Sequence, residues 1–420
     1  MQRTSERTLL LLLAAVQFTH ILDFMVMMPL GEMLMRELSI TPAGFSHLVA
    51  AYTISAGVVG LLAAPFMDRF DRRKVLLVTY AGFILGTRAC AFSKSAATLL
   101  IARAVCGAFG GISGATVLAI VGDIVPPQRR ATGMGIIMSA FAVAAALGVP
   151  FGLFLAQKFR WEMPFFLVAG FAVVIWVLVR MTLPPVRHHL DGTEIHGFHT
   201  FVELIRDPNA GRALIFMSAL VMGHFAVIPL LASFLVSNIG LPEDKLFLVY
   251  MVGGVCSALT APRFGRLADR VGRLRVFGAL IGVASLVTLA ISNSGHLPVW
   301  LALALTGLFF TFASGRFVPG QAILSLAVPA KRRGSFMSLT SCTRDLTSGI
   351  TSSLGGWIVT RSPSGELVNY DKLGWLAVAV SLISFWLASR VTVNDHGHHA
   401  AAKPLPSDTD RAPEASASIS

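Results

Sequence analysis

Long apolar runs separated by short polar segments make up most of the chain. A helix needs roughly 20 largely apolar residues to cross the hydrocarbon core of a membrane. Twelve runs are long enough, at about residues 9–30, 44–66, 75–93, 97–122, 133–156, 163–184, 211–236, 245–262, 275–292, 298–327, 335–360 and 373–393. The pattern predicts an all-α membrane protein with twelve transmembrane helices.

The first run follows Arg3 and Arg7, as the apolar region of a signal peptide would. It is too long for such a region, contains Asp23 and lacks a small-residue cleavage site. We therefore interpret it as the first membrane helix.

The longest polar interruption, residues 185–210, divides the twelve runs into two sets of six. We expect an N-terminal six-helix bundle at 1–184, a cytoplasmic linker at 185–210 and a C-terminal six-helix bundle at 211–393. A short amphipathic helix is predicted within the linker, with the apolar residues Phe198, Phe201, Leu204 and Ile205. The segment 394–420 is rich in Ala, Ser, Pro and charge, so we expect a disordered cytoplasmic tail.

The positions of the charges predict the orientation of the chain. Charged residues make up 13% of the 420 residues, about half the usual share in soluble domains, and the formal net charge is +12. With cytoplasmic termini, 23 Lys and Arg residues fall on the inner side, seven on the outer side and four within the runs. Because cytoplasmic loops of membrane proteins carry the excess of Lys and Arg, we place both termini inside the cell. The positive charge therefore predicts topology and no nucleic-acid partner.

Neither the cysteines nor the histidines predict a metal site. The four cysteines lie far apart inside apolar runs and show no C-x-x-C spacing. The histidines of the predicted cytoplasmic segments are loosely spaced, which favours a solvated cluster over a chelating site. We expect no metal and no other cofactor.

The two halves share an internal repeat. Asp68–Arg72, after the second run, matches Asp269–Arg273, after the eighth, at an offset of 201 residues. A second match, after the fourth and tenth runs, has an offset of 203. In the first run Asp23 precedes a phenylalanine, and His224 does so in the seventh. Such repeats indicate a duplicated six-helix unit, a pattern found in secondary transporters.

The loops after the second and eighth runs resemble a signature of the major facilitator superfamily, G-x-x-x-D-R-x-G-R. The second copy is complete, with Gly265, Asp269, Arg270, Gly272 and Arg273. The first copy has Ala64 and Asp71 at the glycine positions and keeps Asp68, Arg69, Arg72 and Arg73. The resemblance covers all twelve runs and implies two pseudo-symmetric six-helix bundles. It also implies that both copies are gating motifs, in which an aspartate and nearby arginines hold the inner gate closed. The alternative is that these arginines only fix the topology.

The fifth run contains Gly148-Val149-Pro150-Phe151-Gly152, which resembles the antiporter motif of proton-coupled exporters. Alanines occupy the positions of the upstream glycines of that motif, at 144–146. The similarity is greatest to the arabinose-efflux-permease and drug:proton antiporter group, and implies a protein of the bacterial inner membrane. Pro150 lacks a backbone N–H and Gly148 and Gly152 permit close contact, so we predict a kink that seals the interface between the halves. The alternative is a packing kink with no part in coupling.

Ionisable residues inside a membrane are costly, which makes each one a candidate for function. At 1.5 Å of helix rise per residue, Asp23 and Arg103 both reach the outer half of the membrane. We predict that they form a pair in which Asp23 exchanges protons, the alternative being a static pair that fixes the helices. The same arithmetic places Arg316 and Asp345 at one depth, as neighbours.

Four further side chains are candidates for the same cavity. His224 corresponds to Asp23 in the repeat and His20 lies one turn below it, so either histidine could carry protons or simply pack. Arg344 favours an anionic or polyhydroxylated substrate. Asp23 and the soft side chain of Met27 favour a lipophilic cation instead.

Other functional classes fit the sequence less well. No lysine follows a glycine, so the G-x-x-x-x-G-K-[ST] loop of an ATP-driven pump is absent. Gly111-Ile112-Ser113-Gly114 matches the G-x-S-G of intramembrane serine proteases, but the surrounding glycines indicate a face for helix packing. We expect a monomeric, non-enzymatic exporter of a drug, sugar or metabolite, with protons and the lipid bilayer as its other partners. Proton symport or facilitated uptake is the alternative, and a receptor that transports nothing is a third class.

Overall fold

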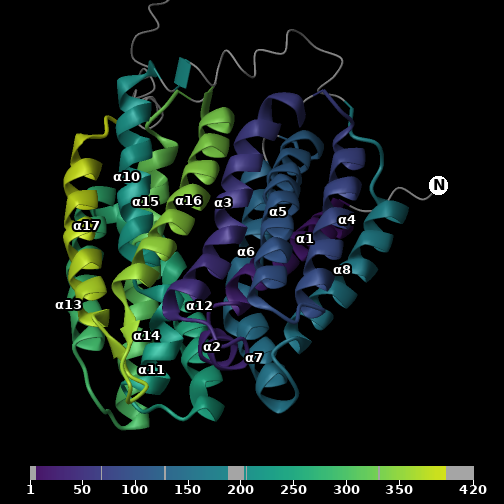
Figure 1. Ribbon diagram of the computed structural model, residues 1–420. Helices are drawn as coiled ribbons and strands as arrows, with labels where there is room; N and C mark the ends of the chain where they lie inside the picture. Colours follow the sequence, from purple (N-terminus) through teal and green to yellow (C-terminus); the bar gives the residue numbers. More distant parts are fainter. Residues whose placement is uncertain are drawn as a thin grey trace, which may run out of the picture.

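The computed structural model describes residues 6–67, 69–126, 129–187, 203–204, 206–329 and 332–393. These residues form a bundle of long helices whose two halves lie side by side (Figure 1). The N-terminal half contains α1 Glu6–Val26, α2 Gly31–Glu37, α3 Pro42–Met67, α4 Arg72–Ala91, α5 Ala96–Ile124, α6 Arg130–Val143, the π-helical segment η1 Ala144–Gly148, α7 Val149–Lys158 and α8 Met163–Thr182. The C-terminal half contains α10 Pro208–Phe225, α11 Ile228–Ser237, the 3-10 turn η3 Glu243–Lys245, α12 Leu246–Val271, α13 Arg273–Ser292, α14 Val299–Gly315, α15 Phe317–Ser325, α16 Arg333–Ile358, β1 Thr360–Arg361, β2 Leu367–Val368 and α17 Tyr370–Arg390.

The helices confirm the predicted fold class. Among the described residues, eleven helical segments are long and apolar enough to cross a membrane, and they correspond to eleven of the twelve predicted runs. The remaining run, 335–360, forms the continuous helix α16, whose many Ser and Thr residues make it too polar to meet the same criterion. The number of twelve crossings therefore stays a prediction.

Large apolar side chains lie on the surface of both halves. Met181 is 75% exposed, Leu286 71% and Trp300 69%. Such exposure is unfavourable in water but suits contact with lipid tails. The surface agrees with a multi-pass membrane protein.

The internal repeat is visible as two interrupted helices. A turn follows α1 at Val26, and a turn follows α10 at Phe225, within two residues of the corresponding position of the second half. Each turn lies close to a proline, Pro29 or Pro229, which has no N–H to continue the helical hydrogen bonding. Interrupted helices at matching positions of two repeats are a feature of secondary transporters.

The two halves meet along α3 and α16, which lie side by side in the middle of the bundle (Figure 1). Glycines allow the approach: a Cβ atom on Gly349 would lie 2.5 Å from Ile54 Cγ1, and one on Gly57 would lie 2.6 Å from Leu346 Cγ. A second seam runs between α12 and the segment η1–α7, where a Cβ on Gly254 would lie 2.6 Å from the Cα of Ala146.

Much of the linker and all of the tail fall outside the described residues. This applies to Phe198, Phe201 and Ile205 of the predicted amphipathic helix and to the segment 394–420. Leu204 is described, and it is buried in the core of the C-terminal half. The predicted domain boundaries at 184, 210 and 393 remain predictions.

Candidate functional site

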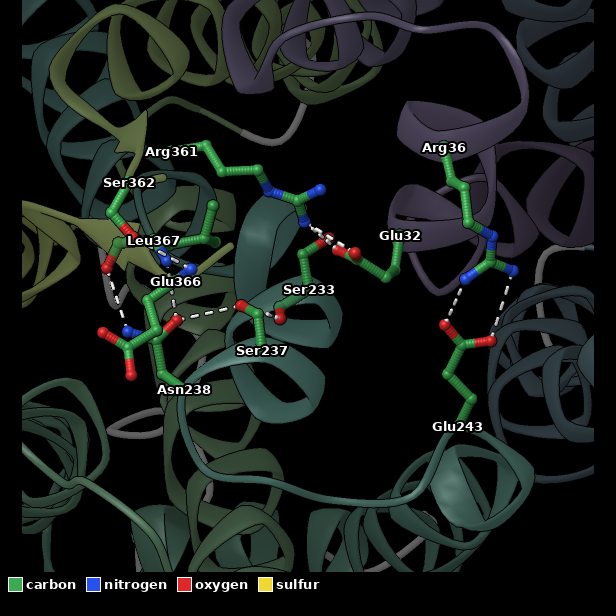
Figure 2. Close-up of polar contacts among 10 residues, drawn as sticks. All are labelled: Glu32, Arg36, Ser233, Ser237, Asn238, Glu243, Arg361, Ser362, Glu366 and Leu367. Atoms are coloured by element: carbon green, nitrogen blue, oxygen red, sulfur yellow. Dashed lines mark hydrogen bonds and ion pairs between the residues drawn. The ribbon is translucent and has the colours of Figure 1, made fainter. Parts of the chain in front are cut away.

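Two ion pairs join the halves at the end of the bundle that is predicted to face outward (Figure 2). Arg36 Nη1 lies 2.7 Å from Glu243 Oε1, and Arg361 Nη2 lies 2.6 Å from Glu32 Oε1. Glu32 and Arg36 are one turn apart on α2, whereas Glu243 begins η3 and Arg361 lies on β1. Both pairs therefore connect the N-terminal half to the C-terminal half.

Further contacts close the same end. The side-chain amide of Gln157 donates a hydrogen bond to the carbonyl oxygen of Glu243. A Cβ on Gly31 would lie 2.9 Å from Ser233 Oγ, so α2 and α11 are in close contact. The hydrogen bond to Glu243 raises the pKa of the Arg36 guanidinium, which keeps this member of the pair charged. The structure is thus closed at its predicted outer end.

Sequence reasoning missed this group of residues. It counted Arg36 and Arg361 only among the seven Lys and Arg residues on the predicted outer side, and it did not consider Glu32 or Glu243. One signal was present: Glu32 and Arg36 are opposite charges at i and i+4 in a chain with few charges. Their partners come from sequence positions more than 200 residues away, which no local pattern indicates.

The predicted pair of Asp23 and Arg103 is present in the structure. Arg103 Nη1 lies 2.7 Å from Asp23 Oδ2, and both side chains are 0% exposed. Thr87 donates to the other carboxylate oxygen at 3.2 Å, and the guanidinium carbon lies 4.6 Å from the ring centroid of Tyr52. The contact is confirmed, while its part in proton coupling remains a prediction.

A second pair lies on α16, where Arg344 Nε is 3.0 Å from Asp345 Oδ1. At 3.6 residues per turn, Asp345 lies on the side of α16 opposite Ile350, Leu354 and Trp357, which form its exposed apolar face. Arg344 lies at the edge of the same inner side. Even so, the Arg344 side chain is 46% exposed and that of Asp345 is 23% exposed. This pair is therefore accessible from within the bundle, unlike that of Asp23 and Arg103.

The prediction that Arg316 and Asp345 are neighbours was wrong. Asp345 pairs with Arg344, and the buried Arg316 donates to Ser381 Oγ at 2.6 Å and to the carbonyl of Ala313 at 3.2 Å. Depth arithmetic gives the height of a residue along its helix but not its direction around the helix. Arg316 also lies at the boundary between α14 and α15.

The remaining candidates for the cavity are packed among apolar side chains. His20 is buried against Phe83, with ring centroids 4.1 Å apart, and neither of its ring nitrogens has a hydrogen-bond partner in the described chain. The ring of His224 stacks on that of Phe309 with centroids 6.2 Å apart. Met27 is completely buried in the main apolar core, which contains residues of both halves. The surroundings of these three side chains do not indicate a part in proton transfer.

The fifth run contains a π-helical segment next to the predicted kink, but its glycines contact a different helix from the one expected. The π-helical segment η1 lies directly before Val149 and Pro150. A Cβ on Gly148 would lie 2.9 Å from Leu22 Cδ1, and one on Gly152 would lie 2.8 Å from Val26 Cγ2, so both face α1 of the same half. The close contact with Gly254 of the other half is made by the alanines of η1, and other residues of α7 also contact α12. The predicted interface role of Gly148 and Gly152 is corrected accordingly.

The first copy of the gating motif is partly visible. Asp68 lies outside the described residues, and Arg69 lies over the ring of Phe66 at 5.8 Å. Arg72 Nε is 3.1 Å from Asp123 Oδ2, which ties α4 to the end of α5. Arg73 Nη2 donates to the carbonyl of Arg180 at 2.6 Å, which ties α4 to α8.

Asp71 replaces a glycine of the family signature and has a structural role of its own. Its Oδ1 accepts a hydrogen bond from the backbone N–H of Arg73 at 3.0 Å and so caps α4. The backbone N–H of Val186 and the side chain of Arg187 donate to the same carboxylate at 3.2 and 3.0 Å. Burial by itself would raise the pKa of Asp71, but these hydrogen bonds outweigh it and hold the pKa below its ordinary value.

In the second copy, Gly272 connects α12 to α13 with φ = +109°. Residues with a Cβ rarely adopt this conformation, which explains a glycine at this position. Asp71, at the matching position, has φ = −56° and requires no glycine. Asp269 and Arg270 are exposed, Gly265 has room around it, and Arg273 begins α13.

Ser113 of the G-x-S-G match lies in a packed helix face. Its hydroxyl donates to Thr79 Oγ1 at 2.9 Å and is buried. A Cβ on the neighbouring Gly111 would lie 2.8 Å from the carbonyl oxygen of Ala56, so these glycines bring α5 against α3. The geometry supports the packing interpretation of this motif.

Comparisons with known proteins agree with the fold. The sequence model of the Major Facilitator Superfamily matches residues 13–315 and, in a second match, residues 214–417. The chain is 24% identical over 354 residues to the uncharacterized MFS-type transporter YceJ of Bacillus subtilis (strain 168), a match that covers 82% of this chain and 87% of the relative. It is 26% identical over 355 residues to a protein of Mannheimia succiniciproducens named a probable sugar efflux transporter, covering 81% and 85% of the two chains. The solved structure of a D-xylose-proton symporter matches with a TM-score of 0.73 at 15% identity, over 90% and 97% of the two chains, and supports the fold alone.

Proposed function

The chain belongs to the Major Facilitator Superfamily, and we propose that it exports a small organic molecule in exchange for protons by alternating access between its two halves. One observation carries the proton coupling: a carboxylate and a guanidinium, Asp23 and Arg103, pair in full burial on two helices of one half. Ionisable residues at such positions in transporters mark ion pathways. The name of the Mannheimia relative supports the direction of export.

The proposal includes the setting of the protein in the cell. The excess of Lys and Arg in the predicted inner segments supports cytoplasmic termini. Bacterial relatives support a location in the inner membrane. We propose a monomer whose chemistry is transport rather than catalysis.

In this mechanism, Asp23 releases Arg103 when it takes up a proton. The neutral carboxyl no longer balances the charge of the Arg103 guanidinium. Thr87 still contacts the carboxyl, and the ring of Tyr52 still lies against the guanidinium. A buried charge without its partner is unfavourable, so protonation favours a rearrangement that hydrates Arg103 or brings it a new partner. For exchange, the proton enters from the outer side while the ion pairs of Arg36 and Arg361 are open. These pairs then close and the inner gating motifs open, so that the proton moves inward and the substrate moves outward.

The accessible pair on α16 is the proposed place of substrate contact. Arg344 and Asp345 lie on the inner side of a helix with many hydroxyl side chains, such as Ser341 and Ser348. Guanidinium, carboxylate and hydroxyl groups together suit a polyhydroxylated or anionic solute. A sugar or sugar-like metabolite is therefore the favoured substrate class.

The test is flux in proteoliposomes under an imposed pH gradient, with sugars, organic anions and lipophilic cations as candidate substrates. We expect Asp23→Asn to abolish proton-driven flux while exchange driven by a substrate gradient continues, which also shows that the variant is folded. The matched control is Asp371→Asn, which removes an exposed carboxylate in the first turn of α17. Unchanged pH-driven flux in Asp23→Asn would contradict the assignment of Asp23 as the proton-coupling residue. Flux in the direction of the proton gradient would favour symport over export.

A further inference from the structure

A groove of about 630 Å³ opens on the side of the N-terminal half, between α4 and α8. These helices lie at the edge of the bundle that is farthest from the C-terminal half (Figure 1). The groove wall is apolar, with Leu77, Val78 and Leu85 from α4 and Phe109 from α5. It therefore faces the membrane and is separate from the seam between the halves.

The mouth of the groove is strongly basic. Four cations line it, Arg73 and Lys74 in the first turn of α4, Arg180 in the last turn of α8, and Arg187. Asp71 is the one carboxylate among the lining residues that the structure describes, and hydrogen bonds from Arg187 and two backbone N–H groups already occupy it. An excess of positive charge remains for a ligand.

Two details describe the surroundings of the cations at this mouth. Arg73 Nε is buried without a hydrogen-bond partner in the described part of the chain. The Arg180 guanidinium lies 5.5 Å from the ring centroid of Trp176, which itself donates to the carbonyl of Leu77. Tryptophan and arginine in this arrangement are typical of the boundary between headgroups and acyl chains.

We propose that this groove binds an anionic phospholipid of the inner leaflet. The phosphate groups contact the cations at the mouth, chiefly Arg73 and Lys74, and an acyl chain lies along the apolar wall. Basic pockets between membrane helices on the cytoplasmic side suit anionic headgroups. A soluble anion would use the cations but not the apolar wall, and a neutral lipid would use the wall but not the excess charge.

Trp176 allows a direct measurement. We would replace the other five tryptophans by phenylalanine and measure quenching of Trp176 in phosphatidylcholine bilayers that contain acyl-brominated phosphatidylglycerol or, at equal fraction, acyl-brominated phosphatidylcholine. A matched control keeps Trp386 alone, because Arg390 lies over its ring at 5.4 Å in the same way and neither residue lines the groove. We expect the preference for the anionic lipid at Trp176 to exceed that at Trp386 by about fivefold.

Two variants separate the headgroup from the acyl chain. Arg73→Gln with Lys74→Gln should reduce the preference at Trp176 to the level of Trp386 and leave the quenching by phosphatidylcholine unchanged. Ala81→Phe keeps every charge but fills the groove beside its apolar wall, and it should lower the quenching of Trp176 by both lipids. Equal preferences at Trp176 and Trp386 would overturn the proposal, because they indicate diffuse attraction to the surface. An unchanged signal in Ala81→Phe would overturn it as well, because the acyl chain would then lie elsewhere.

Discussion

At the scale of single residues, the two charged pairs inside the bundle differ in their surroundings. Asp23 and Arg103 are fully enclosed, whereas Arg344 and Asp345 remain accessible. Removing one partner of a buried pair typically costs about 3–5 kcal/mol because the other charge is left without compensation. Replacing both partners by apolar residues of similar volume can be nearly neutral.

We therefore expect a strong coupling between substitutions of Asp23 and Arg103. Asp23→Leu and Arg103→Met should each lower the thermal unfolding midpoint in detergent, and the double variant should be more stable than either single variant. The same cycle at Arg344 and Asp345 should show a much smaller coupling, because water already reaches that pair. Additive effects at Asp23 and Arg103 would contradict this expectation.

The sequence predicted one of these pairs and missed the other for a geometric reason. Counting residues from the ends of a helix gives depth, which was enough to match Asp23 with Arg103. It also matched Arg316 with Asp345, whose side chains point to different neighbours. The direction around a helix depends on packing with distant segments, and that information is not local in the sequence.

At the scale of elements, the seam between α12 and η1 depends on small residues. A Cβ on Gly254 would lie 2.6 Å from the backbone of Ala146, and backbone atoms cannot give way as a flexible side chain can. The alanines at 144–146, which stand where the related motif has glycines, belong to the part of the fifth run that touches the other half. Motif comparison identified the right helix, but only the packing shows which of its residues reach the seam.

We expect Gly254→Val to destabilise the structure by about 1–3 kcal/mol, the usual cost of overpacking a close contact. The matched control is Gly282→Val on α13, where a Cβ would meet nothing within 4 Å. Thermal unfolding midpoints in detergent, compared with the unaltered protein, measure both effects. Equal losses in the two variants would show that helix propensity, and not the seam, determines the change.

At the scale of the whole molecule, the closed outer end depends on interactions that are individually weak. Exposed ion pairs contribute about 0.2–1 kcal/mol each, so the pairs of Arg36 and Arg361 bias the conformation without locking it. The sequence predicted two halves and their topology from the repeat and the positions of Lys and Arg. It did not predict this closure, because the partners belong to opposite halves of the chain.

We expect Arg36→Glu to open the outer end, since two carboxylates would then face each other across the halves. Ser233, which is buried beneath Gly31, provides the reporter. In a background without the native cysteines, Ser233→Cys should react faster with a membrane-impermeant maleimide when combined with Arg36→Glu. The exchanged pair Arg36→Glu with Glu243→Arg should restore slow labelling. If labelling stays fast in the exchanged pair, the ion pair between residues 36 and 243 does not explain the closure.

The polar helix α16 has a consequence for how the chain enters the membrane during synthesis. An arginine or aspartate at the centre of an isolated helix costs about 2.5–3.5 kcal/mol on insertion, and α16 carries Arg344 next to Asp345. Its hydroxyl-rich sequence offers little apolar compensation when the helix leaves the translocation channel alone. Contacts with α3 and α10, which are synthesised earlier, supply the partners it needs. Integration of α16 therefore depends on helices made before it, of which α3 belongs to the N-terminal half and α10 to its own half.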